Sequence, residues 1–202
     1  GYHWTAATFS VAHELENGRE GEYTYYNDSW IHNTLQATQI SSPLDFRTFT
    51  GQESFSNPIF YWTQLPYYAV PCRAKTNMRV AILVRNIFEE QKSRFYQTGH
   101  TTETEQEYFK ENYLTSVIGF LNSWGEYHER FPERCLIVKY EDLFEETFNT
   151  LKPLASFLQL KVSDEALSQA IQRCSKSEMK KRMPPDIQNS PTQTRVTFEK
   201  KD

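Results

Sequence analysis

The sequence has little cysteine and no long hydrophobic run, and each scarcity excludes a class of protein. Its three cysteines, Cys72, Cys135 and Cys174, are far apart and show neither metal-binding spacing nor a disulfide framework. No apolar run approaches the roughly 20 residues that a membrane-spanning helix needs. The first residues, GYHWTAATFSVAHEL, lack the basic start and apolar core of a signal peptide. These features predict a cytoplasmic protein without a membrane span.

The sequence also lacks the basic excess of a nucleic acid or heparin binder, because its formal net charge is −4. A nucleic acid partner is therefore not expected, although a local basic site remains possible. Aromatic residues, in contrast, are abundant, with 14 Phe, 12 Tyr and 4 Trp. They indicate a large core or pockets lined by flat rings. The length of 202 residues suits one domain, residues 1–202, with a polar tail at 185–202. The oligomeric state stays open.

Short apolar runs alternate with helical patterns along the chain. Strands are predicted at 59–64, 79–84 and 135–140, and helices at 4–16, 88–97, 104–130, 141–159 and 163–173. The Asn17-Gly18 pair marks the end of the first helix. Residues 17–58 are expected to be mostly irregular. This alternation predicts an α/β fold with a central parallel sheet flanked by helices.

An arginine ends the most apolar of these strands. Arg85 directly follows RVAILV, and a serine, Ser93, comes eight residues later on the next helix. Ligands of open parallel sheets bind at the carboxyl ends of the strands, where a helix N-terminus favours anions. An arginine fork and a hydroxyl at this place suit a phosphate. Alternatively, Arg85 only caps the strand and pairs with Glu89 or Glu90.

The start of the chain has the layout of a phosphate loop. Gly1 allows a close backbone approach, and a helix begins within the next residues, GYHW. A Walker pattern with its Lys-Ser/Thr pair is not found in the sequence. Taken alone, this start is a weak signal.

Together these motifs resemble the sulfotransferase family that uses 3'-phosphoadenosine 5'-phosphosulfate (PAPS). That family has a loop of the form Lys-Ser-Gly-Thr-Thr-Trp, whose last four places match Gly1, Tyr2, His3 and Trp4. Its second signature, a strand ending in Arg-Asn-Pro with a Ser eight residues after the Arg, matches Arg85, Asn86 and Ser93, with Ile87 in place of Pro. Its Tyr-Glu-Asp-Leu motif matches residues 140–143.

The resemblance implies the phosphate-loop-NTPase-like sulfotransferase fold and a role for each of these residues. The loop at 1–4 would hold the phosphosulfate, with Trp4 stacked on adenine or, alternatively, in the core. Arg85 and Ser93 would hold the 3'-phosphate, and Tyr140 would lie near the nucleotide. PAPS would be the sulfuryl donor, and adenosine 3',5'-bisphosphate (PAP) the product.

The sequence also departs from the family pattern. The loop lysine and the strand before it would precede Gly1, so we expect the parent protein to continue upstream. The family's Thr-His-Leu-Pro stretch, which supplies the catalytic base, reads TQLP at 63–66. Gln64 is not a useful base near neutral pH. His3 is the first candidate for a substitute, and His32, Asp45 and Glu53 are others.

Three functions are consistent with these features. The first is a PAPS-dependent sulfotransferase that acts on the hydroxyl of a small molecule, whose pocket could include the aromatic residues at 61, 62, 67 and 68, unless these belong to the core. The second is a nucleotide-binding relative with weak or no activity, because Gln64 stands at the position of the base. The third is another phosphate-loop protein, such as a small kinase.

Overall fold

The computed structural model describes most of the predicted elements. It describes residues 2–19, 37–40, 60–63, 65–70, 79–98, 104, 107–108 and 113–181. The elements in chain order are α1 (Tyr2–Glu16), β1 (Ala37–Ile40), β2 (Phe60–Thr63), η1 (Tyr67–Ala69), β3 (Val80–Val84), α4 (Ile87–Thr98), α6 (Tyr113–Arg130), η3 (Pro132–Arg134), β4 (Cys135–Lys139), α7 (Asp142–Glu145), α8 (Thr147–Phe157), α9 (Asp164–Arg173) and α10 (Lys176–Lys181).

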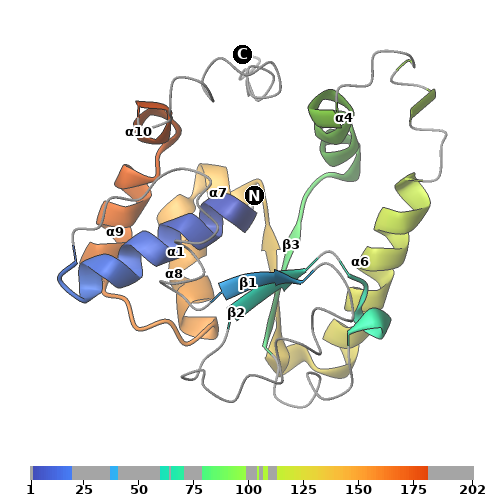
Figure 1. The fold of residues 1–202 in the computed structure, drawn as a ribbon. Coiled ribbons are helices and arrows are strands. Elements are labelled where there is room, and N and C mark those ends of the chain that lie inside the picture. The colour runs from blue at the N-terminus through green and yellow to red at the C-terminus, as the bar shows by residue number, and fades with distance from the viewer. Residues whose placement is uncertain are drawn as a thin grey trace.

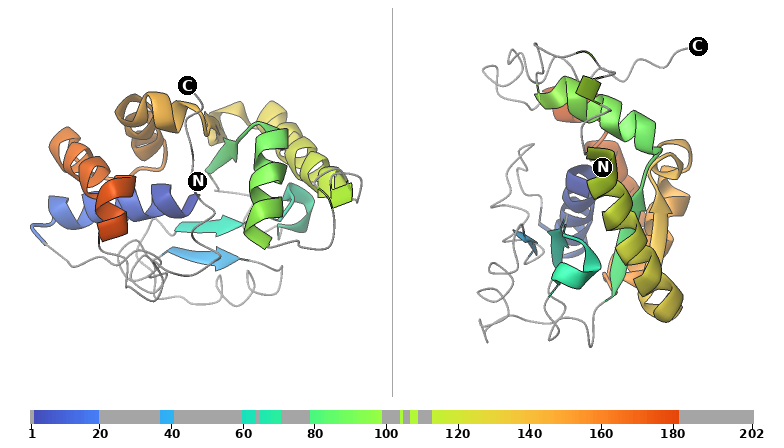
Figure 2. Two further views of the ribbon diagram at one scale, coloured as in Figure 1. Left: turned by 90° about the horizontal axis from the view of Figure 1, so that it is seen from above. Right: turned by 90° about the vertical axis from the view of Figure 1, so that its right-hand side faces the viewer.

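The described strands form two parallel pairs. β3 pairs with β4 over its whole length, from Val80 opposite Cys135 to Val84 opposite Lys139. β1 pairs with β2 in the same parallel sense. The helices α1, α9 and α10 lie on one side of the β3–β4 pair and α4 and α6 on the other (Figures 1 and 2). The predicted α/β fold with parallel strands flanked by helices is confirmed.

The described part of the segment 17–58 includes one short strand. β1, at 37–40, lies inside this stretch, which we expected to be mostly irregular. Its sequence, ATQI, has no continuous apolar run, so its strand character comes from pairing with β2 about 20 residues later. Apart from β1 and residues 17–19, this stretch lies outside the described residues, so the expectation that it is mostly irregular stays a prediction.

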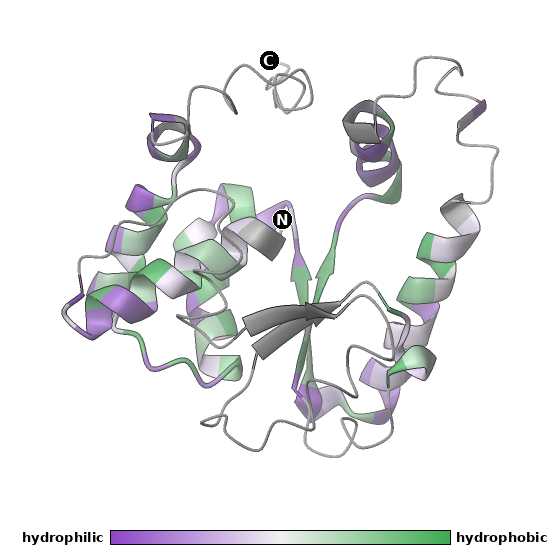
Figure 3. Cartoon of the chain, viewed as in Figure 1, coloured by the Kyte–Doolittle hydropathy of each residue, from purple (hydrophilic) through white to green (hydrophobic). Residues whose placement is uncertain are grey.

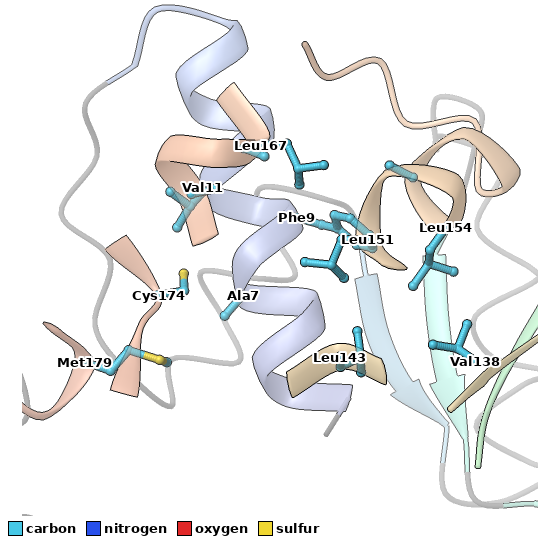
Figure 4. Packing of buried hydrophobic residues seen from close by; sticks show 13 residues of the cluster. Ala7, Phe9, Val11, Val138, Leu143, Leu151, Leu154, Leu167, Cys174 and Met179 are labelled. Carbon is cyan, nitrogen blue, oxygen red and sulfur yellow. The ribbon is translucent and has the colours of Figure 1, made fainter. Parts of the chain in front are cut away.

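The main core lies between α1, α8, α9 and the end of β4. Its most deeply buried members include Ala12, Leu151, Leu167 and Ala170, none more than 1% exposed. Figure 4 shows how side chains from all these elements converge. α1 packs along α9, and it ends at Gly18, whose φ of 68° is a left-handed conformation that suits glycine. The predicted stop signal is confirmed.

A second core joins α6 to the β3–β4 pair and to residues 65–70. It contains Ile82, Trp124, Tyr127 and Cys135, with Val70 from the segment after β2. The spacing of three and four residues within 104–130 predicts a face formed by Tyr113, Leu114, Val117, Ile118, Leu121, Trp124 and His128. Trp124 is buried as predicted, but Ile118 is 43% exposed, and Tyr127, which the repeat omits, is fully buried. Tyr127 is buried because its ring packs on that of Tyr67, a partner that the periodicity of the helix does not indicate.

One carboxylate links the end of α1 to the start of α9. Glu16 Oε2 accepts the Ser163 backbone N–H at 2.8 Å, and Ser163 Oγ caps α9 by accepting the Ala166 N–H. Hydrogen bonds from the side chain and then the backbone of Ser163 lower the pKa of Glu16. Because the folded pKa lies below the unfolded one, the link contributes stability above the unfolded pKa and loses it as pH falls through the folded pKa.

We therefore expect Glu16→Gln to be less stable than the unaltered protein at pH 7, with the difference shrinking as pH falls below about 4. Urea unfolding curves at pH 7 and pH 3.5 measure this difference. The matched control is Glu129→Gln, which removes an exposed carboxylate from α6. An equally large pH-dependent change in that variant would contradict the assignment to the Ser163 link.

Candidate functional site

The carboxyl ends of β3 and β4 place Arg85 beside Tyr140. Each residue directly follows its strand, and the Tyr140 N–H donates to Val84 O at 2.8 Å, which continues the pairing by one step. The chain between β3 and α4 is hydrophilic, in contrast to the mainly apolar strand that precedes it (Figure 3). The prediction that Arg85 stands at the carboxyl end of a parallel strand is confirmed.

The Arg85 guanidinium lies over the Tyr140 ring, with its Cζ 4.7 Å from the ring centroid. This is cation–π geometry. Burial raises the pKa of the Tyr140 phenol; Arg85 opposes this shift, and Glu141 adds to it. Phe144, from α7, packs edge-on against the same ring with centroids 4.9 Å apart. Tyr140 is thus a neutral aromatic support that orients a cation at the strand edge.

Asn86 starts the helix that follows Arg85. Its side-chain Oδ1 accepts the N–H groups of Phe88 at 3.0 Å and Glu89 at 3.3 Å, and its carbonyl accepts the Glu90 N–H at 2.9 Å. These contacts cap the N-terminus of α4. An asparagine at this position therefore ends the strand-to-helix turn immediately after Arg85 and aims the positive end of the helix dipole toward the same edge.

Ser93 lies in α4 with its side chain exposed. It is six residues beyond Ile87, so it lies about 9 Å along the helix from its first residue. The predicted alternative for Arg85 included a pair with Glu90, but Glu90 binds Arg94 at 2.9 Å, four residues along the same helix. The helix thus neutralises Glu90 internally.

Trp4 lies in the first turn of α1 and is half-buried. Its indole Nε1 donates to Cys174 O, at the C-terminal end of α9, at 2.8 Å, and its ring packs against the main core. The start of α1 lies next to α7, which follows β4 (Figure 1). Residues 2 and 3 form helical backbone here, while Gly1 and the side chains of Tyr2 and His3 lie outside the described residues.

The segment after Gln64 is anchored to α6. The Tyr67 N–H donates to Ser123 Oγ at 2.9 Å, and Trp124 Nε1 donates to Leu65 O at 3.1 Å. Tyr67 packs on Tyr127 with ring centroids 4.7 Å apart, so it belongs to the second core. Tyr68 is 75% exposed. Gln64 itself, with the other base candidates His32, Asp45 and Glu53, lies outside the described residues.

Comparison with known proteins gives the family. The sequence model of a protein family, the sulfotransferase domain, matches residues 27–201 of the chain. The chain belongs to the sulfotransferase family. Its similarity to that family therefore covers most of the sequence, including β3, α4 and the strand edge that carries Arg85 and Tyr140.

Solved sulfotransferase-like structures resemble the fold. Mouse sulfotransferase SULT7A1, complexed with PAP, is 20% identical with a TM-score of 0.57, covering 71% of this chain and 66% of its own. Retinol dehydratase, in complex with androsterone and the inactive cofactor PAP, is 14% identical with a TM-score of 0.57, covering 88% of this chain and 62% of its own. The chain thus spans less than two thirds of the length of either neighbour. The search of curated proteins found no match to it.

Sequence reasoning missed one residue at this edge. Glu141 accepts the Asn86 N–H at its Oε1 over 3.1 Å, although the two residues are 55 positions apart. Its sequence signal is its place in the YEDL motif, which predicted a role for Tyr140 alone. Among the described helices of the chain, none has the length and apolar character of a membrane span.

Proposed function

We propose that this sulfotransferase moves a sulfuryl group from PAPS to a hydroxyl of a small-molecule acceptor. The observation that carries the proposal is the Arg85 guanidinium held over Tyr140, at a parallel-strand end followed at once by a capped helix. A cation beside a helix N-terminus suits a phosphate group. PAP in both solved neighbours supports a nucleotide of this kind as the ligand.

In this proposal each site residue keeps the role that its motif implies. Arg85 and Ser93 hold the 3'-phosphate, and Tyr140 lies near the nucleotide. Gly1 and the first turn of α1, with Tyr2, His3 and Trp4, hold the phosphosulfate. The Trp4 indole N–H donates to Cys174 O and its ring packs partly against the main core, so stacking on adenine would use the part of the ring that the core leaves exposed. Bound PAPS would supply the activated sulfuryl group.

Positioning and cationic charge carry most of the rate in such a transfer, because charge spreads over the peripheral oxygens of the moving group. An acceptor hydroxyl also benefits from a base, which typically contributes about a hundred- to ten-thousand-fold. His3 is our candidate for that role, with Gln64 at the position where the family has its base. An acidic acceptor such as a phenol would depend least on the base.

The acceptor proposed is a small alcohol or phenol. The androsterone bound by retinol dehydratase is a small molecule of this kind. The net charge of −4 disfavours polyanionic acceptors, which basic grooves bind. The exposed Tyr68 ring, on the segment that follows Gln64, is available to contact an apolar acceptor.

The test is calorimetric titration with PAP, on the 202-residue chain and on a form extended upstream, followed by assay of sulfuryl transfer from PAPS to a panel of phenols and alcohols. Micromolar PAP binding with transfer is the expected result. Absence of PAP binding by both folded forms, or binding of ATP in its place, would overturn the proposal.

A second candidate function is a nucleotide-binding relative without transfer activity, and Gln64 at the base position favours it. PAP binding without transfer to any acceptor, in the extended form as well, would select this candidate.

A further inference from the structure

The carboxylate of Glu141 reaches across the strand edge to the backbone next to Arg85. Its Oε1 accepts the Asn86 N–H at 3.1 Å. We propose that Glu141 is a positioning residue that fixes Arg85 for binding a phosphate. This inference rests on the proposed function, in which Arg85 holds the 3'-phosphate.

The hydrogen bonds at this edge hold both peptide planes that flank the Arg85 Cα. The plane before Arg85 carries the Val84 carbonyl, which accepts the Tyr140 N–H at 2.8 Å. The plane after it carries the Asn86 N–H, which Glu141 accepts. Because each peptide unit is rigid, these two bonds restrain both backbone dihedrals of Arg85. Two consecutive residues at the end of β4 thus fix the direction in which the Arg85 side chain projects from the backbone.

The side chain of Arg85 has a further support from the same place. Its guanidinium lies over the ring of Tyr140, the residue directly before Glu141. A fork held in this way loses less conformational freedom when it binds an oxyanion, so affinity rises without any new contact to the ligand. Glu141 restrains the backbone after Arg85, while Tyr140 restrains the backbone before it through its N–H and supports the guanidinium with its ring.

The charge of Glu141 makes the proposal easy to test, because it opposes the proposed function electrostatically. A carboxylate near an arginine that binds phosphate repels the phosphate, so removing its charge alone would strengthen binding. Loss of a positioning hydrogen bond would weaken binding. Charge repulsion and positioning therefore predict opposite changes in PAP affinity when the same substitution is made.

The experiment measures PAP binding by calorimetry for three variants, in whichever form of the protein binds PAP. Glu141→Ala removes the acceptor, and Glu141→Asp keeps the charge but shortens the side chain by one methylene. We expect both to raise the dissociation constant about three- to tenfold. Glu141→Gln keeps an acceptor oxygen at the same reach, and its affinity should equal or exceed that of the unaltered protein.

Two controls separate positioning from general damage. Glu145→Ala removes an exposed carboxylate from the adjacent helix, α7, and should leave PAP affinity unchanged. Adenosine 5'-phosphate lacks the 3'-phosphate, so its affinity should be the same in all four variants. Hydrogen exchange should also show faster exchange of the Asn86 amide in Glu141→Ala and Glu141→Asp.

The outcomes distinguish this inference from the proposed function. Stronger PAP binding by Glu141→Ala, or equal losses for PAP and adenosine 5'-phosphate, would overturn the positioning role while the nucleotide site stands. If Glu141→Ala does not fold, the other two variants decide: Glu141→Asp should weaken PAP binding, and Glu141→Gln should keep or strengthen it. A protein that binds no PAP before any substitution would instead overturn the proposed function.

Discussion

Replacing Arg85 with alanine is expected to weaken PAP binding about a hundredfold, which corresponds to about 2.7 kcal/mol. The substitution removes a guanidinium fork that stands over Tyr140 at the end of β3. A phosphate held by such a fork would lose its charge-assisted hydrogen bonds, and nothing else in the variant would replace them. Arg85→Lys should recover only part of the affinity, because an ammonium group cannot bind two phosphate oxygens as a fork. Titration calorimetry with PAP measures all three proteins.

The matched control is Arg79→Ala, at the opposite end of the same strand. Arg79 precedes β3, about 20 Å from Arg85 along the strand, and donates to Phe157 O at 2.9 Å. Arg79→Ala changes the net charge by the same amount as Arg85→Ala, so any loss of PAP affinity common to both variants is a long-range charge effect. Equal losses of PAP affinity in the two variants would contradict a specific phosphate site at Arg85. Binding of adenosine 5'-phosphate should be similar in both.

Replacing Leu151 with alanine is expected to lower the free energy of unfolding by between about 2 and about 5 kcal/mol. Leu151, in α8, is fully buried in the main core, where it lies close to Phe9 of α1 (Figure 4). The substitution removes apolar contacts and leaves a cavity between α1, α8 and the end of β4. Urea unfolding monitored by circular dichroism measures the change.

Ile118→Ala is the matched control for this second prediction. It also truncates a large aliphatic side chain in a helix, but Ile118 is 43% exposed on α6. Its expected effect is below about 1 kcal/mol. If the two substitutions destabilised the protein equally, the main core would not depend on Leu151 as its burial indicates.

The helices show how well sequence periodicity predicts helix bounds and buried residues. α1 and α9 match their predicted ranges closely, and the stop at Gly18 follows from the residue itself. The buried face of α6 was predicted less well, since Tyr127 is fully buried and Ile118 is not. Aromatic and polar side chains such as Ser123 are buried in α6 because they bind the segment at 65–70. The hydrophobic periodicity of α6 does not indicate contact with that segment.

The elements of the candidate site can be predicted from local sequence. A continuous apolar strand that ends at Arg85, an asparagine that caps a helix, and a serine eight residues after the arginine can all be recognised locally, because strand burial and helix capping depend on neighbouring residues. The same motifs gave the family, and the match over residues 27–201 confirms it.

How these elements meet depends on contacts between distant parts of the fold. Arg85 lies on Tyr140, and Asn86 binds Glu141, because the parallel register of β3 and β4 brings together residues 55 positions apart. The Trp4 indole binds Cys174 O across 170 positions, because α1 packs along α9. Such contacts depend on strand register and helix packing, which combine many weak interactions from distant parts of the chain.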